Sequence, residues 1–150
     1  EVRTSRDGER RIPLEDLYVL PGDTPEKETA LEMGDLITAV YLPPPVAGRQ
    51  LYRKVRDRAS YAFALVSVAA IVDVTDGTIS RADLAFGGLA PMPWGHKAVE
   101  EALVGKEVSD DVFDRAADAL LDDAKGQGGN DFKIPLARRT LKAVLQDATR

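Results

Sequence analysis

Four basic residues lie close together in the middle of the chain. Against a single acid, Asp57, the residues Arg53, Lys54, Arg56 and Arg58 give this segment a local charge of +3. Such a stripe can hold a phosphate group or the electron-rich ring of a redox cofactor. Tyr61 follows it, and an aromatic ring can pack on a flat cofactor. A solvated strand edge, where basic side chains prevent aggregation, explains the same residues, so both interpretations stay open.

Two glycine-rich segments are candidates for phosphate binding. Gly87-Gly88 follows an expected strand, and residues 126–129 precede an expected helix. Backbone N–H groups in turns of this kind can bind an anion. However, Pro91 and Pro93 separate the first segment from the next helix, and the second lacks the Lys-Ser/Thr of a P-loop. The patterns therefore favour a tight turn for the first segment and a flexible connector for the second.

The single histidine and the acidic residues form no recognisable catalytic group. His96 lies beside Trp94 at an expected helix start, and no spacing relates it to a serine or aspartate of a triad. We expect it to be an exposed residue at the start of that helix. Nine acids and two bases occur between Glu100 and Asp123 without a calcium-loop pattern, which favours solvated helix faces over a metal site.

The elements that position these residues follow the order of strands first and helices second. Residues 62–74 and 78–86 are β-rich runs on either side of a turn, and they predict an antiparallel hairpin. Helices are expected over 96–104, from Ser109 to about Lys125, and from near Pro135 to the end. This order predicts an α+β fold in which three helices cover one face of an antiparallel sheet.

The first third of the chain reads as a separate, smaller unit. Asp7-Gly8 is a strong hairpin-turn signal, and residues 36–42 form another β-rich run. Three consecutive prolines at 43–45 cannot donate ladder hydrogen bonds, so we place the boundary there and divide the chain into 1–45 and 46–150. Because a two-stranded hairpin is marginal alone, we expect a remnant of a larger domain, with an open edge that favours self-association.

Composition excludes several classes of function. The 150 residues include 20 basic and 25 acidic ones, for a net charge of −5, which argues against nucleic acid as a partner. With no cysteine and one histidine, disulfides, iron–sulfur ligation and multi-histidine metal sites are excluded. The longest apolar run, 62–72, is too short to cross a bilayer. We therefore expect a soluble, cytoplasmic protein with no membrane partner.

Several segments together resemble one family. Residues 52–64, 84–94 and 131–139 are similar to the C-terminal domain of the FAD-binding subunit of molybdenum hydroxylases, the family of xanthine dehydrogenase and carbon monoxide dehydrogenase. Residues 11–22 and 35–40 resemble the end of the FAD-binding domain that precedes it. The resemblance covers essentially the whole chain. The 150-residue sequence lacks the Gly-Gly-rich loops with which the family holds the FAD pyrophosphate.

The resemblance implies a role in electron transfer. It implies a flavoprotein subunit that relays electrons from [2Fe-2S] clusters on a small subunit, which receive them from a molybdopterin-binding large subunit, through FAD to an acceptor. By position it implies that Ile37, Lys54 and Tyr61 contact the flavin, and it implies no catalytic or metal-binding residue. We expect FAD in the parent protein and weak or no binding by this chain. The alternative is a docking domain that binds partner subunits without flavin.

Overall fold

The computed structural model describes the backbone of residues 2–4 and 8–150 and the side chains from residue 8 onward. The chain forms two compact units, residues 1–46 and 47–150. The division falls beside the three prolines at 43–45. The identity of the first unit as a remnant of a flavin-binding domain stays a prediction.

A three-stranded antiparallel sheet forms one layer of the second unit. Strands β4 (Arg49–Val55), β5 (Val66–Thr75) and β6 (Thr78–Gly87) lie in the order β4-β5-β6. The β5–β6 turn contains Asp76 and Gly77, both at positive φ. Positive φ at both central residues is the requirement of the tight hairpin turn that matches strand twist. The predicted antiparallel hairpin is therefore confirmed.

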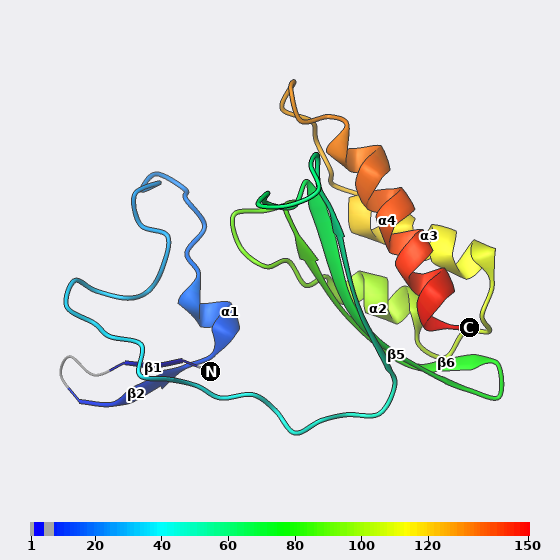
Figure 1. Ribbon diagram of the computed structural model, residues 1–150, viewed down its shortest axis with the longest axis horizontal. Coiled ribbons are helices and arrows are strands. Elements are labelled where there is room, and N and C mark those ends of the chain that lie inside the picture. Colours follow the sequence, from blue (N-terminus) through cyan, green and yellow to red (C-terminus); the bar gives the residue numbers. More distant parts are fainter. Residues whose placement is uncertain (1, 5–7) are drawn as a thin grey trace. The chain divides into compact units, whose positions relative to one another are not determined.

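Three helices form the other layer. Helices α2 (Lys97–Leu103) and α4 (Lys133–Ala148) pack on the sheet, and α3 (Asp110–Leu121) packs against both helices. Figure 1 shows all three on the same side of the strands. Alternate residues of β5 enter the core, and the apolar stripes of the helices cover them. The predicted α+β architecture is confirmed. The largest buried residues of this core are Phe86, Ile79, Leu103, Leu141 and Leu145.

The predicted start of α3 is confirmed, but its predicted end is wrong. The Ser109 side chain accepts a hydrogen bond from the backbone N–H of Val112, as an N-cap does. The helix ends at Leu121 and not near Lys125. Asp122 and Asp123 place negative charge at the negative end of the helix dipole, which disfavours another turn. The residues after Leu121 form the loop that leads to α4.

The first unit has a small sheet of its own. Strands β1 (Val2–Thr4), β2 (Arg10–Ile12) and β3 (Ala39–Val40) are ordered β2-β1-β3, and the short helix α1 (Leu14–Leu17) follows β2. The predicted pairing of the first two strands is confirmed, although Asp7 lies outside the described residues. Residues 36–42 contribute only two residues of strand, fewer than expected. No helix in the described part of the chain is long and apolar enough to span a membrane.

Candidate functional site

The residues expected to contact a flavin lie in both units. Ile37 belongs to the first unit, in the segment that enters β3, and its side chain is about half exposed. Lys54 lies near the end of β4, and Tyr61 lies in the loop between β4 and β5, both in the second unit.

Lys54 lies on the face of the sheet opposite the helices. It pairs in register with Ser67 of β5, which in turn pairs with Gly87 of β6. Side chains alternate along a strand, so neighbours in one register row share a face. The Lys54 side chain is exposed and has no hydrogen bond or ion pair with any residue from Gly8 onward. It is therefore a cation available to a bound group.

The sheet surface beside Lys54 combines small residues with one exposed aromatic residue, Tyr52, which pairs in register with Ala69. Ser67 and Gly87 form one row, and Ala69 and Ala85 pair in the next row along the strands. A Cβ on Gly87 would lie 2.5 Å from the Ser67 Oγ, so these two strands are already in close contact there. Because Ser67 is buried, the floor open to a bound group is formed by Ala69 and Ala85 beside the Tyr52 ring. A planar ring can lie against such a floor with the Lys54 amine at its end.

Tyr61 lies in an exposed aromatic loop. Tyr61 and Phe63 are 95% and 97% exposed, and Tyr61 has a φ of 51°. The Arg58 guanidinium donates a hydrogen bond to the Tyr61 carbonyl oxygen, and its carbon lies 5.9 Å from the centre of the Tyr61 ring. These contacts hold the backbone of Tyr61 in a left-handed conformation that a non-glycine residue rarely adopts.

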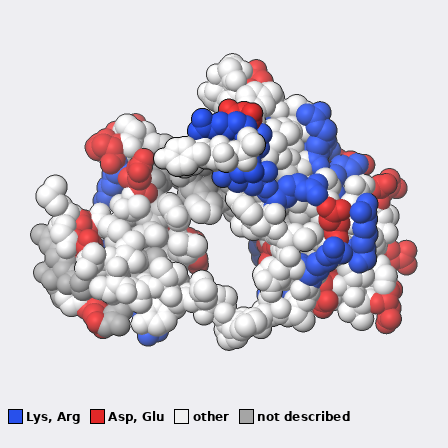
Figure 2. Space-filling view, in the orientation of Figure 1, with Lys and Arg blue, Asp and Glu red and all other residues white. Residues whose placement is uncertain are grey.

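The basic stripe divides into two parts. Arg53 points to the helix face of β4 and forms an ion pair with Asp147 of α4, with Nη2 and Oδ2 2.5 Å apart. Arg53 therefore joins two elements of the fold. Lys54, Arg56 and Arg58 are exposed. Figure 2 shows Lys and Arg side chains gathered on the second unit, with acidic side chains among them.

The two glycine segments have the structural roles that their sequence favours. Gly88 has a φ of 77°, and a Cβ there would lie 2.7 Å from the backbone oxygen of Leu65. Gly88 is therefore in a tight turn packed against the preceding loop. Residues 126–129 lie in the connection between α3 and α4. The tight turn at Gly88 and the position of 126–129 between two helices are as predicted, and the flexibility of that connector stays a prediction.

The acidic residues of α3 are more than a solvated face. Side chains of α4 reach across to three of them, in the pairs Lys142–Asp114 at 2.6 Å, Arg138–Asp118 at 2.6 Å and Gln146–Asp110 at 2.9 Å. Most of these acids are nevertheless exposed, so they agree with the predicted solvated face, and three of them also join α3 to α4. Among the residues that the structure describes, no group of acidic or histidine side chains is arranged to hold a metal ion.

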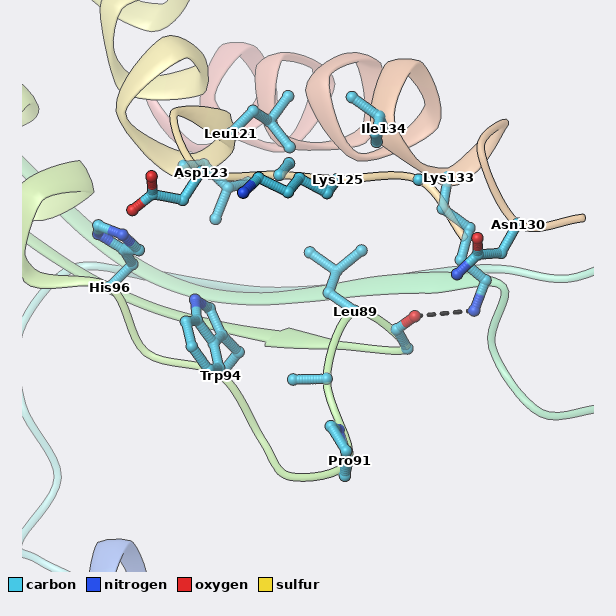
Figure 3. A pocket seen from close by; sticks show the side chains of 15 residues that line it. Leu89, Pro91, Trp94, His96, Leu121, Asp123, Lys125, Asn130, Lys133 and Ile134 are labelled. Carbon is cyan, nitrogen blue, oxygen red and sulfur yellow. Dashed lines mark hydrogen bonds between the residues drawn. The ribbon is translucent and has the colours of Figure 1, made fainter. Parts of the chain in front are cut away.

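His96 differs from the expectation of an exposed residue. It is half-buried, and its Nδ1 atom is buried with no hydrogen-bond partner in the part of the chain that the structure describes. It lines a cavity of about 690 Å³ in the second unit, shown in Figure 3. The neighbouring Trp94 is held by two backbone hydrogen bonds to Phe86, of 2.8 and 2.9 Å. Sequence reasoning missed this cavity, whose one local signal is the Trp-Gly-His sequence before α2.

Comparison with known proteins identifies related sequences. The sequence profile of the CO dehydrogenase flavoprotein C-terminal domain matches residues 50–148. The aldehyde oxidoreductase FAD-binding subunit PaoB of Escherichia coli is 47% identical over 148 residues, which are 99% of this chain and 43% of that protein. The glyceraldehyde dehydrogenase medium chain of Sulfolobus acidocaldarius is 29% identical, over 74% of this chain and 37% of that protein. The chain thus spans less than half the length of these relatives.

Solved structures with the same fold include larger enzymes. Carbon monoxide dehydrogenase from Hydrogenophaga pseudoflava matches 98% of this chain and 51% of its own chain, with a TM-score of 0.83 and 24% identity. Quinoline 2-oxidoreductase from Pseudomonas putida 86 matches 99% of this chain and 51% of its own, with a TM-score of 0.82 and 21% identity. At these identities the likeness establishes the fold.

Proposed function

The chain belongs to the CO dehydrogenase flavoprotein C-terminal domain family, and we propose that it is the C-terminal part of a flavoprotein subunit in a molybdenum hydroxylase. In that role it helps to relay electrons from iron–sulfur clusters through FAD to an acceptor. The observation that carries this proposal is the 47% identity to an aldehyde oxidoreductase FAD-binding subunit over nearly the whole chain. Its partners are then a molybdopterin-binding large subunit and a [2Fe-2S] small subunit, in the cytoplasm.

Lys54 is the central residue of the proposed flavin contact. A bound flavin supplies the capacity to accept and release electrons. Lys54 lies on the same face of the sheet as Tyr52, Ala69 and Ala85, and its side chain has no partner among residues 8–150. A cation there stabilises negative charge that develops on a planar ring. Ile37 and Tyr61 add apolar and aromatic contact in this proposal.

The residues of this chain fit one end of FAD better than the other. A flat surface with one cation suits the ring system. The pyrophosphate requires several convergent backbone N–H donors or cations. Of the two glycine segments, Gly88 is packed against Leu65, and the 126–129 connector lacks the residues of a P-loop. We therefore assign the ring contact to this chain and the pyrophosphate contact to sequence that precedes its counterpart in the longer relatives.

A docking domain that binds no flavin by itself is the second candidate function. The exposed aromatic side chains of Tyr61 and Phe63 favour it, since aromatic residues are enriched at the centres of protein interfaces. In that case the β4–β5 loop contacts a partner subunit. Lys54 then affects the binding of the partner subunits and not the midpoint potential of the flavin.

The decisive experiment compares Lys54→Ala with Lys106→Ala in the flavin-containing subunit that includes this chain. Lys106 is an exposed lysine outside the sheet surface and serves as the matched control. We expect Lys54→Ala to lower the midpoint potential of the flavin, because the reduced, more negative ring loses a cation, while Lys106→Ala leaves it unchanged. An unchanged potential with weakened binding of the partner subunits would instead support the docking function.

A further inference from the structure

The cavity beside His96 has the size and lining of a small-molecule site. Its volume of about 690 Å³ lies within the range of ligand pockets. Three segments form its walls: the loop after β6, the end of α3 with the following loop, and the start of α4. Figure 3 shows Leu89, Trp94, Leu121 and Ile134 around it, so much of the wall is apolar or aromatic.

His96, which lines the cavity, has a buried nitrogen behind the accessible wall. The His96 Nδ1 is buried and has no hydrogen-bond partner among the described residues. A buried polar atom without a partner costs on the order of the desolvation of that group, so such atoms usually meet a water or a ligand. The Trp94 and His96 rings are 6.5 Å apart and tilted by 49°. Both residues line the cavity, but the Nδ1 atom itself is closed to a ligand, so only the accessible edge of the imidazole can take part in binding.

The charged side chains around the cavity favour a single negative charge. Lys125 and Asp123 have neither a hydrogen bond nor an ion pair with any residue that the structure describes. The Lys133 amine is already engaged, since it donates a hydrogen bond of 2.8 Å to the Gly88 carbonyl. Two lysines against one aspartate leave the lining with a net charge of +1. In Figure 3 the Lys125 side chain extends along the cavity toward the end where His96 and Trp94 lie.

We propose that this cavity binds a small carboxylate monoanion with a planar apolar ring, of the chemical class of benzoate. The ring packs among the apolar walls and Trp94, and the carboxylate meets the Lys125 amine and the accessible edge of the His96 imidazole, not its buried Nδ1. A charge-assisted hydrogen bond to Lys125 is stronger than a neutral one, which favours an acid over the matching alcohol. A dianion such as inorganic phosphate is disfavoured, because Asp123 repels the second charge.

The chain contains its own reporter for this site. Trp94 is its single tryptophan and lines the cavity, so tryptophan fluorescence reports occupancy directly. We expect benzoate to change this fluorescence saturably, with a Kd of about 1 mM, a strength that ligands of this size commonly reach. Benzyl alcohol and inorganic phosphate are expected to bind at least about fivefold more weakly. Equal binding of benzyl alcohol would overturn the assignment of a carboxylate.

Two substitutions test which residues hold the acid. Lys125→Met and His96→Phe are each expected to weaken benzoate binding about fivefold or more, because each removes a polar partner of the carboxylate. Lys106→Met, which removes an exposed lysine outside the cavity, is expected to leave the Kd unchanged. Near-ultraviolet circular dichroism checks that the variants keep the native packing. Unchanged binding in a folded Lys125→Met variant, or no saturable signal with the unmodified chain, would overturn the proposal. Neither result depends on flavin, so this test stands apart from the proposed function.

Discussion

The Arg53 guanidinium and the Asp147 carboxylate lie 2.5 Å apart and join β4 to the last turns of α4. Lys54, the next residue, points to the opposite face of the same strand and has no such partner among residues 8–150. Alternation along a strand therefore divides two adjacent basic residues between the structure of the domain and its exposed surface.

Because Arg53 has an ion-pair partner and Lys54 has none among residues 8–150, replacing each residue should affect the stability of the domain differently. We expect Arg53→Ala to lower the free energy of unfolding by about 0.5–1 kcal/mol, since the ion pair is only partly buried. Lys54→Ala should change it by less than about 0.5 kcal/mol, as an exposed residue with no partner. Urea unfolding of the two variants and the unmodified chain measures both. A larger loss for Lys54→Ala would contradict the assignment of its role to ligand contact.

Local sequence signals were sufficient for the main elements of the second unit. The alternation in β6, the turn at Asp76-Gly77 and the cap at Ser109 act over a few residues, so they could be recognised without a structure. The Arg53–Asp147 pair could not, because 94 residues separate its members. The same reason applies to the cavity at His96, whose walls come from three segments that only tertiary packing brings together.

The close contact between Gly87 and Ser67 predicts a non-additive pair of substitutions. Gly87→Ala places a Cβ 2.5 Å from the Ser67 Oγ and should destabilise the domain by about 1–3 kcal/mol. Ser67→Ala removes that oxygen, and the Ser67 Cβ lies 3.9 Å away, so the double variant should recover most of the loss. Chemical denaturation of the single and double variants measures this coupling.

Gly88→Ala provides the matched control for this pair. Its Cβ would meet the backbone oxygen of Leu65 at 2.7 Å, and its φ of 77° is unfavourable for alanine. Ser67→Ala cannot relieve either problem, so no recovery is expected. Recovery in the Ser67→Ala/Gly88→Ala variant, or none in the Gly87 pair, would show that the contact is not the cause.

The small sheet of the first unit should be the less protected one. Its strands have three, three and two residues, and Val40 and Leu42 are largely exposed. Short ladders with few buried contacts open at low free-energy cost. We expect amide hydrogen exchange at Ala39 and Val40 to be much faster than across β5, as measured by NMR or mass spectrometry on a demonstrated monomer. Equal protection in a monomer would contradict the expectation of a weakly anchored unit.

Binding of FAD by the 150-residue chain should be weak, with a Kd on the order of millimolar, or about −4 kcal/mol. The chain offers Lys54 as one cation beside a flat sheet surface, but the pyrophosphate needs several convergent donors that neither glycine segment supplies. Quenching of flavin fluorescence on titration with the chain measures this affinity. Lys54→Ala should weaken FAD binding further. Lys106→Ala changes an exposed residue away from the sheet surface and should leave the affinity for FAD unchanged. Stoichiometric quenching at micromolar concentration would show that this chain holds the pyrophosphate as well, and the assignment of that contact to preceding sequence would be wrong.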